Sequence, residues 1–592
     1  MRKCYRYILT AVVFFLFGAV LLYVPSVAGL ADNTDFIRVT RPLGMIPDKN
    51  LRFFYFQRRF EYIRSFDNLG HFLKFVLYPG VNESSFKSTQ FVFVKAAQVI
   101  SGVISYLKTN RISHFDITAL SSMFLALHSI SVTWLFKNLR TGKKACVFFL
   151  LLIIVTVFFC MGYLLYYNSL FGESVILWSF LLWFSALVHL LKSGKRSYSA
   201  LTLYFMSAIV FTGAKVANIP LGFLIGIFSI YFFFNTETAG KKVLVILGVS
   251  AVFAASVYFY TAIPSWMKKP NNYHSIFFGI LKNSENPEED LEKLGIDAKY
   301  AVLADTNVYV DLKGFDVFSP EFEKEVHDKA GPVEVTLYYL KNPGRMMEKL
   351  NISAEASLFI RPPYLGNYQV EDNAEILKFA GRNLVWEWLR KQFTGHAFAV
   401  ITLVFVLYTS VIVHEFLLHM KTKCTSYSLF LPAKILLMVF ALSQWIFPVI
   451  GNGEADLVKH MFLFNLLLDT MIIVLAADIV KLTAGNPANR RFIFPLLGLL
   501  VISAGLLAAD SKICSNGITT FGKYNGKAIE WEILDESGSH YFLQQRILSI
   551  TGPFHQKATA GRYRIYGPGS TMTPKTVFCL SFQKMKRKGL KR

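Results

Sequence analysis

The sequence predicts a mainly α-helical protein that crosses a membrane many times. Of its 592 residues, 53% are hydrophobic and only 17% are charged, whereas soluble domains carry roughly 25% charged residues. The apolar residues fall into runs of about 20, the length that a helix needs to cross the hydrocarbon core. A membrane β-barrel would show short alternating segments instead.

Basic residues give the chain a formal net charge of +23, which could indicate nucleic-acid binding. The Lys and Arg residues, however, gather in short loops between apolar runs, as in "KNLRTGKK", "KSGKR" and "KLTAGNPANRR". Loops of this composition stay on the cytoplasmic side. We therefore expect a multi-pass protein of the inner or plasma membrane, with a cytoplasmic N-terminus, an extracytoplasmic C-terminus, membrane lipids around it and no nucleic-acid partner.

The apolar runs predict about eleven spans. The first run is longer than the apolar core of a signal peptide, which favours an uncleaved first span. The predicted spans cover residues 7–29, 115–136, 145–166, 174–191, 199–214, 217–234, 243–263, 396–418, 429–450, 459–480 and 492–510.

Three larger segments then lie outside the membrane. In the first of them Phe53, Phe56, Phe60 and Ile63 recur at helical spacing, which predicts either an amphipathic helix in the membrane interface or a packed helix with a basic face. The predicted domains are an N-terminal transmembrane module with this first outer loop (1–263), an extracytoplasmic loop domain (264–395), C-terminal transmembrane helices (396–510) and a small extracytoplasmic β-domain with a basic tail (511–592).

The β-domain follows from three segments that alternate in polarity and are separated by Gly and Asn, namely "KAIEWEIL", "HYFLQQRIL" and "RYRIYG". Cys514 and Cys579 both fall in this domain. Their spacing neither requires nor excludes a disulfide in an oxidising compartment.

Charged residues collect at the outer ends of the spans, first in "GLADNTDFIRV" (29–39), which carries Asp32, Asp35 and Arg38. Asp35 and Arg38 are three residues apart and would share a helix face. The turn "YYNSLFGES" adds Asn168 and Glu173. Taken singly, such groups could be surface ion pairs worth little.

The third such place is "GNGEADLVKH" (451–460). If a helix begins near Asn452, then Asp456, Lys459 and His460 share one face and Glu454 points elsewhere. The free N–H groups of that helix start would also favour a bound anion. The acidic residues could equally be ordinary helix starts favoured by the helix dipole.

Asp469, Asp478 and Lys215 lie within predicted spans, where ionisable groups are candidates for function. Asp469 lies ~15 Å along the helix from Lys459 and is too deep to join the outer cluster. We expect it to make a buried polar contact, with Lys215 as the candidate partner.

Carboxylates and cations at an outer membrane face suit sugar transfer from a polyprenyl-phosphate donor. The acceptor hydroxyl needs a carboxylate base near the anomeric carbon. The leaving phosphate needs cations to hold its charge. Arg361, in the rigid segment "IRPPYLGNY", is a further candidate cation. The spacing demands no metal, although a divalent ion bridging carboxylate and phosphate is compatible with it.

The layout of spans and outer loops resembles the GT-C superfamily of membrane glycosyltransferases. "DNTDFIRV", "YYNSLFGES", "GNGEADLVKHMFLFNLLLD" and "LKNPGRMMEKL" followed by "RPPYLGNY" look like bacterial hexose transferases of surface-layer glycan assembly. The resemblance implies a catalytic acid in the first outer loop and interfacial helices beside it. Asp35 matches that acid, and Asp32 offers a second candidate.

The expectation is a polyprenyl-phosphate-sugar-dependent glycosyltransferase acting on a glycan, lipid or protein acceptor. A transporter or flippase of lipid-linked glycans is the rival from another class, and a membrane scaffold is a third alternative. The candidate catalytic residues are Asp35, Glu173 and Asp456, and the candidate substrate-binding residues are Asp32, Arg38, Asn168, Arg361, Glu454, Lys459 and His460.

Overall fold

Helices occupy each of the first ten predicted spans. The computed structural model describes residues 2–46, 55–80, 86–140, 144–193, 196–309, 312, 314–363, 365–369, 383–422 and 430–485, and strands between residues 519 and 581. The helices are α1 (Arg2–Tyr23), α5 (Thr118–Leu139), α6 (Lys144–Phe158) with α7 (Met161–Leu164) and the 3-10 helix Leu165–Asn168, α8 (Glu173–Ser193), α9 (Tyr198–Thr212), α10 (Ile219–Phe234), α11 (Ala239–Thr261), α18 (Ala397–Thr422), α20 (Leu431–Asn452) and α22 (Phe462–Gly485).

Within the described residues, nine helices are long and apolar enough to cross a membrane. The pair Cys146–Phe158 and Met161–Asn168, bent by 45°, makes a tenth if it is one span. Helix α9 is shorter than a full span. The predicted span 492–510 lies outside the described residues. The prediction of a polytopic helical membrane protein is confirmed.

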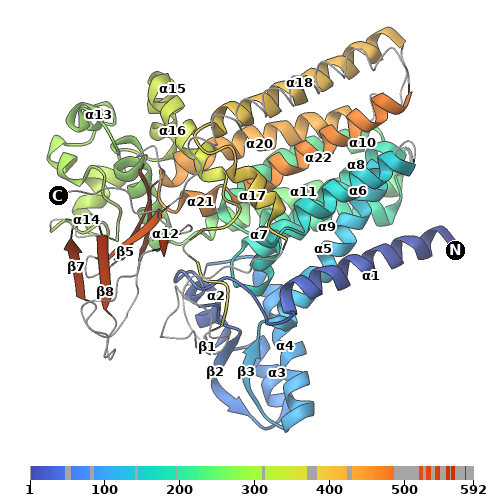
Figure 1. Ribbon diagram of the computed structural model, residues 1–592, viewed down its shortest axis with the longest axis horizontal. Coiled ribbons are helices and arrows are strands. Elements are labelled where there is room, and N and C mark those ends of the chain that lie inside the picture. The colour runs from blue at the N-terminus through green and yellow to red at the C-terminus, as the bar shows by residue number, and fades with distance from the viewer. Residues whose placement is uncertain are drawn as a thin grey trace.

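The long helices run side by side as one bundle, with the N-terminus at one end (Figure 1). The described parts of the first two segments predicted to be extracytoplasmic gather at the opposite end of the bundle, which we call the outer end. The turns that join α7 to α8 and α20 to α22 also lie at that end. All the candidate site residues come from this end.

The first outer loop contains a small sheet, and here the predicted helix is wrong. Residues Arg59–Phe66 form strand β2, which pairs in antiparallel fashion with β1 (Met45–Ile46) and β3 (Ile112–Asp116). Phe60 and Tyr62 lie on one face of the strand and are buried, whereas the next residue, Ile63, is half exposed. This alternation of burial has the period of a strand. Phe53 lies outside the described residues.

Two helices complete the first outer loop, namely α3 (Leu69–Leu77) and α4 (Gln90–Thr109). Phe72 and Phe75 of α3 pack on Tyr62 of the sheet, with ring centroids 5.4 and 5.8 Å apart. Helix α4 is one of the nine apolar helices, and the span prediction missed it. In Figure 1 it runs across the direction of α1 at the outer end of the bundle.

The second outer segment is helical where the structure describes it. Pro332 starts one helix and Pro343 starts the next, in the first helical turn where a proline is tolerated. The elements are α12 (Ser265–Ser275), the π-helix Ile276–Ile280, α13 (Pro287–Lys293), the 3-10 helix Ala298–Leu303, α14 (Pro320–Phe322), the π-helix Glu323–His327, α15 (Pro332–Lys341), α16 (Pro343–Ser357) and α17 (Val385–Lys391).

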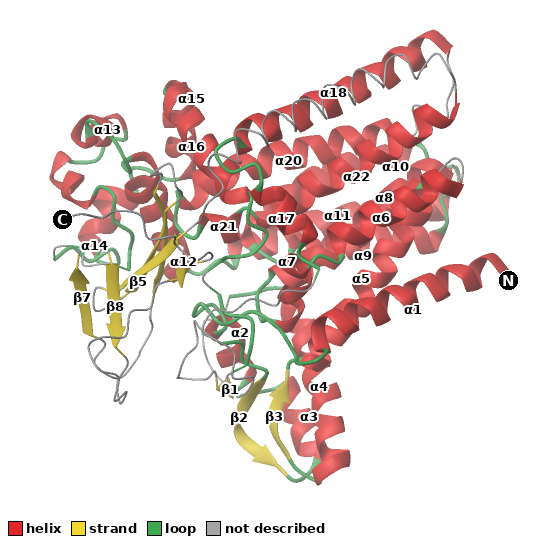
Figure 2. Cartoon of the chain, in the orientation of Figure 1, coloured by secondary structure: helices red, strands yellow, loops and turns green. Residues whose placement is uncertain are grey.

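Figure 2 shows the described strands in two places, the first outer loop and the C-terminal segment. The C-terminal strands pair in the order β6-β5-β4-β9, and β7 pairs with β8. They are β4 (Thr519–Tyr524), β5 (Ala528–Leu534), β6 (His540–Arg546), β7 (His555–Thr559), β8 (Arg562–Tyr566) and β9 (Leu580–Ser581). A separate extracytoplasmic β-domain stays a prediction, as do the domain boundaries. Cys514 and Cys579 lie outside the described residues.

Ionisable groups inside the bundle join helices to one another. Lys434 of α20 lies 2.7 Å from Glu415 of α18 and 2.6 Å from Asp478 of α22. The partner predicted for Asp469 was wrong: its carboxylate binds Arg390 of α17 at 2.5 Å and accepts a hydrogen bond from Tyr163. Because an unpaired charge in a membrane interior is costly, these contacts fix how the helices pack.

The charge pattern of the loops generates a test of orientation. Glu292, exposed in the last turn of α13, and Ser199, exposed at the start of α9, lie at opposite ends of the bundle. In a cysteine-free background we expect Glu292→Cys to react with a membrane-impermeant maleimide in intact spheroplasts. Ser199→Cys should react only after lysis. The reverse pattern would contradict both the orientation and the outer position of the candidate site.

Candidate functional site

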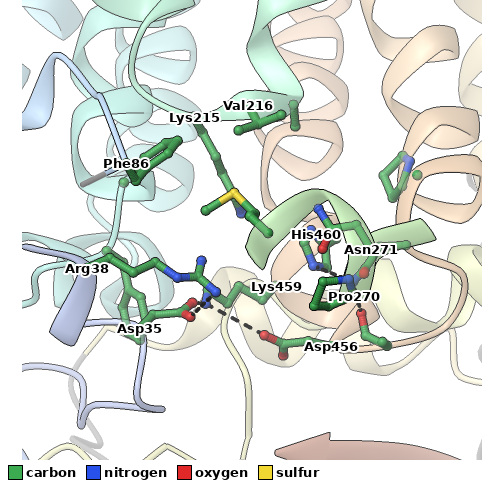
Figure 3. Close-up of a pocket in the computed structure, with 18 of the residues that line it drawn as sticks. Asp35, Arg38, Phe86, Lys215, Val216, Pro270, Asn271, Asp456, Lys459 and His460 are labelled. Carbon is green, nitrogen blue, oxygen red and sulfur yellow. Dashed lines mark hydrogen bonds and ion pairs between the residues drawn. The ribbon is translucent and has the colours of Figure 1, made fainter. Parts of the chain in front are cut away.

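A cavity of about 1670 Å³ opens at the outer end of the bundle. The close-up in Figure 3 shows charged side chains from segments far apart in the sequence turned toward it. The first outer loop supplies Asp35 and Arg38, and the turn after α20 supplies Asp456, Lys459 and His460. The cavity is also lined by apolar residues at the ends of α10, α12 and α20, among them Val216, Pro220, Met267, Ile446 and Phe447.

The centre of the charged part is the carboxylate of Asp35. One of its oxygens lies 2.9 Å from the guanidinium of Arg38, and the other accepts a hydrogen bond from the ammonium of Lys459. Lys459 is buried, whereas the Asp35 side chain is 22% exposed. The carboxylate therefore bridges two cations at the cavity wall.

The local fold explains why Asp35, rather than Asp32, faces the cavity. Asp32 is buried, and its Oδ1 accepts a hydrogen bond from the backbone N–H of Phe36 at 3.0 Å. This bond fixes the turn that leads into α2 (Ile37–Thr40). Asp35 lines the cavity and Asp32 does not. The structure thus distinguishes Asp35 from Asp32 by position, which the sequence could not do.

The two partners shift each other's titration. Burial alone raises the pKa of Asp35, but Arg38 and Lys459 outweigh it and hold this pKa far below its usual range. Burial alone lowers the pKa of Lys459, but Asp35 and Asp456 raise it above its usual range. Asp35 thus contributes stability that is lost as the pH falls below about 4, and Lys459 stability that is lost as the pH rises above about 10.

A second ion pair lies beside the first. Glu173, at the start of α8, is buried and lies 2.5 Å from Lys215, and both residues line the cavity. Lys215 lies between α9 and α10, where the chain turns at the outer end of the bundle. It is therefore a wall residue of the cavity and not the partner of Asp469.

The turn after α20 differs from the predicted helix start near Asn452. Helix α20 ends at Asn452, and the next helical turn, α21, covers Leu457–His460. Asp456 precedes it in the left-handed conformation, at φ 50°, which Asp adopts more readily than most residues. Asp456 Oδ2 lies 3.7 Å from Lys459 and 3.4 Å from the amide nitrogen of Asn33. The expected anion site at a helix N-terminus near Asn452 is absent from this described turn.

Gly453 lets the turn pack directly on the second outer segment. Its φ is 56°, and a Cβ there would clash with the carbonyl oxygen of His274 and lie 2.7 Å from that of Phe278. The following residue, Glu454, is buried and binds Lys282 at 2.6 Å and Lys349 at 2.7 Å. Glu454 therefore fastens the turn to the outer segment and does not line the cavity.

His460, a candidate substrate-binding residue, is not a cation in this cavity. Burial lowers the pKa of its imidazole well below the usual value, and Lys215 and Lys459 lower it further. The ring of His460 lines the cavity. It is uncharged at neutral pH and can act there only as a neutral hydrogen-bonding group.

Two other predicted residues do not line the cavity. Asn168 is buried and donates a hydrogen bond from its amide to the carbonyl oxygen of Ala28 at 2.8 Å, which holds the start of the first outer loop. Arg361 is buried 3.6 Å from Glu387 of α17. Their positions indicate structural roles.

Sequence reasoning missed cavity residues of the second outer segment. Trp266 lies under the guanidinium of Arg38, at 5.6 Å from the ring centroid, and His274, Asn307 and Tyr339 line the same wall. Trp266 could have been predicted from its place beside the end of an apolar run, because Trp is enriched at the membrane–water interface. The other three carry no sequence pattern, because the fold of the outer segment brings them to the cavity.

The described residues lining the cavity include four cations and three carboxylates. The cations are Arg38, Arg41, Lys215 and Lys459, and the carboxylates are Asp35, Glu173 and Asp456. With neutral histidines, these groups carry one net positive charge. Among the described residues, no three His, Cys, Asp or Glu side chains gather so that they could hold a metal ion.

A family model described as the YfdI N-terminal transmembrane domain matches residues 2–490, which is well over half of the chain. The chain belongs to this family. The YfdI match ends near the last described helix of the bundle, so the bundle and both outer segments that build the cavity lie within the family domain. No curated protein matches the chain by sequence.

The packing of Gly453 generates a stability test. Gly453→Ala should lower the free energy of unfolding by about 2–3 kcal/mol, because the left-handed backbone and the close carbonyl oxygens leave no room for a methyl group. The apparent melting temperature of the purified protein in detergent measures this. Gly451→Ala is the matched control, since a Cβ there meets nothing within 4 Å. An equal effect of both variants would contradict the assigned packing.

The Asp35–Lys459 pair generates a second test. Lys459→Met should destabilise the protein by up to about 3 kcal/mol, because Asp35 keeps only Arg38 as a partner in a partly buried place. Adding Asp35→Asn should recover part of this loss. Lys293→Met, which breaks ion pairs at the surface, should have a much smaller effect, because solvent screens such pairs. If the losses from Asp35→Asn and Lys459→Met simply add, the two residues are not coupled.

Proposed function

We propose that the protein is an integral membrane glycosyltransferase that moves a sugar from a polyprenyl-phosphate donor to an extracytoplasmic acceptor. The observation that carries the proposal is the carboxylate of Asp35, held by Arg38 and Lys459 in a cavity with both charged and apolar walls. Membership of the YfdI family, a family of transmembrane domains, is consistent with this function.

The charged wall suits the phosphate of the donor. A phosphodiester carries one negative charge, and the described groups of the cavity carry one net positive charge. Arginine and lysine are the side chains that bind phosphate oxygens most strongly. Arg38 and Lys459 already hold an anionic group, the Asp35 carboxylate, in the place where we position the phosphate.

The apolar wall suits the lipid part of the donor. Phe447 of α20 and Trp266 of α12 line the cavity and are also more than a third exposed. Val216 and Pro220 continue this wall toward α10. A polyprenyl chain lying along these residues would leave its phosphate at the membrane interface, beside the cations.

The proposed reaction begins when the donor phosphate takes over the cations that hold Asp35. The carboxylate then loses part of its stabilisation as an anion, and its pKa rises toward the range of a useful base. Asp35 accepts the proton of the acceptor hydroxyl while that oxygen bonds to the anomeric carbon. The bond from this carbon to the phosphate oxygen breaks, and the phosphate leaves with the electron pair.

Glu173 and Asp456 have supporting roles in this proposal. Glu173 holds Lys215 at the wall, and Asp456 lies near Lys459. The GT-C fold, the surface-layer type of acceptor, the inner or plasma membrane and the outward position of the cavity belong to the same proposal. They rest on the resemblance of the motifs and on the basic loops at the other end of the bundle.

A flippase for lipid-linked glycans would use similar groups but would leave the bond between sugar and phosphate intact. Product analysis separates the two functions. When purified protein is mixed with labelled polyprenyl-phosphate sugars and a cell-envelope extract, a transferase moves the label to the acceptor. A transporter leaves the label on the lipid.

The decisive variant is Asp35→Asn. We expect it to lower the transfer rate by about 10²–10⁴-fold, because a positioned base is lost. The measurement is the initial rate of label transfer at a temperature well below the melting temperature of the variant, by protein whose elution profile matches the wild type. Asp67→Asn is the control, since Asp67 lies in the same loop with a side chain 84% exposed. Near-normal turnover by Asp35→Asn would remove Asp35 from the role of base.

A further inference from the structure

An asparagine amide joins two histidines at the wall of the cavity. The amide of Asn452, the last residue of α20, lies between the rings of His274 and His460. Its Oδ1 is 3.0 Å from Nδ1 of His274, and its Nδ2 is 2.9 Å from Nε2 of His460. His274 and Asn452 are buried, and His460 faces the cavity.

The orientation of this amide follows from a third contact. Nδ2 of Asn452 also lies 2.9 Å from the carbonyl oxygen of Ala455. A carbonyl oxygen can only accept, so the atom facing it must be the amide nitrogen. The amide oxygen must then face His274.

The hydrogen bonds of His274 agree with this orientation of the amide. The backbone N–H of Val308 donates to Nε2 of His274 at 3.2 Å. Nε2 therefore carries a lone pair, and the proton of the neutral ring sits on Nδ1. That N–H donates to the oxygen of Asn452, as the contact with Ala455 requires. Two independent neighbours thus fix the same direction of hydrogen bonding.

The orientation of the Asn452 amide also determines which nitrogen of His460 carries the proton. The second hydrogen of the Asn452 amide points at Nε2 of His460, which must accept it and cannot carry a proton. His460 is therefore a neutral imidazole with its proton on Nδ1. Among the described residues no acceptor faces this Nδ1–H, and the atom is not enclosed by protein.

We infer that His460 donates an uncharged hydrogen bond from Nδ1 to an oxygen of the bound substrate, with Asn452 and His274 as the positioning residues that set its tautomer. The inference rests on the proposed function for the identity of the substrate. The oxygen belongs either to the donor phosphate or to a hydroxyl of the sugar, since both accept from a neutral N–H. The cations Arg38 and Lys459 remain the groups that neutralise the phosphate charge.

The tautomer can be measured without any activity. In full-length protein labelled with ¹⁵N-histidine, the two ring nitrogens of His460 are assigned by the loss of their signals in His460→Gln. We expect Nδ1 to be protonated and Nε2 to be bare at pH 7, in protein without substrate. A protonated Nε2, or a ring protonated on both nitrogens, would overturn the inference even if the protein is a glycosyltransferase.

Two substitutions at His460 test the Nδ1–H donor separately from the rest of the ring. His460→Asn keeps an N–H near the position of Nδ1, whereas His460→Gln places its amide near Nε2. The probes are farnesyl phosphate and farnesyl phosphate carrying glucose, galactose or mannose, bound to purified protein in detergent. We expect His460→Gln to weaken binding roughly three- to tenfold, the worth of one neutral hydrogen bond, and His460→Asn to weaken it less.

The two kinds of probe distinguish the oxygen that accepts the bond. If His460→Gln weakens the binding of farnesyl phosphate itself, the acceptor is a phosphate oxygen. If it weakens only the binding of a sugar-bearing probe, the acceptor is a sugar hydroxyl. Equal losses in both variants, or none in either, would overturn the donor role. If no probe binds even to wild type, the proposed function fails while the nitrogen signals still decide the tautomer.

Discussion

The contact between Asp35 and Lys459 joins residues 424 positions apart in the sequence and sets the geometry of the cavity. One partner lies in the first outer loop and the other in the turn before the last described helix of the bundle. Because a partly buried carboxylate needs compensating charge, neither segment can move far without weakening the charge compensation of both Asp35 and Lys459. In the proposed function, the same contact is the one that the donor phosphate would replace. The proposal thus makes structural order and ligand binding depend on one pair of charges.

Other contacts of the turn after α20 serve to hold Lys459 in place. Gly453 allows the turn to lie against the carbonyl oxygens of the second outer segment, and Glu454 binds Lys282 and Lys349 of that segment. Asn452 adds the link to His274. The stretch "GNGEADLVKH" is thus divided between residues that fasten the turn and residues that face the cavity. Its conspicuous charges do not all have the same role.

The sequence predicted the bundle well because each span must satisfy the same simple requirement, an apolar run of sufficient length. It failed in the first outer loop, where Phe56, Phe60 and Ile63 fit helical spacing but Phe60 and Tyr62 also fit a strand. Pairing with β3 decided between the two, and such pairing is not visible in local sequence. For the site, the sequence found Asp35, Arg38 and Lys459 because they lie at the ends of spans. It could not tell Asp35 from Asp32, place Glu454 with its lysines, or find Asn307 and Tyr339, because those outcomes depend on tertiary contacts.

The neutrality of His460 follows from the arrangement of charge around it. Lys215 and Lys459 disfavour a further positive charge nearby, and the amide of Asn452 occupies Nε2 with a donor. A protonated His460 would lose this hydrogen bond and add to the repulsion among the cations. The cavity therefore combines fixed positive charges with a neutral donor, His460, whose tautomer is set by the buried residues Asn452 and His274. For a substrate that joins a phosphate to a sugar, this arrangement offers charge to one part and an uncharged hydrogen bond to a chosen oxygen.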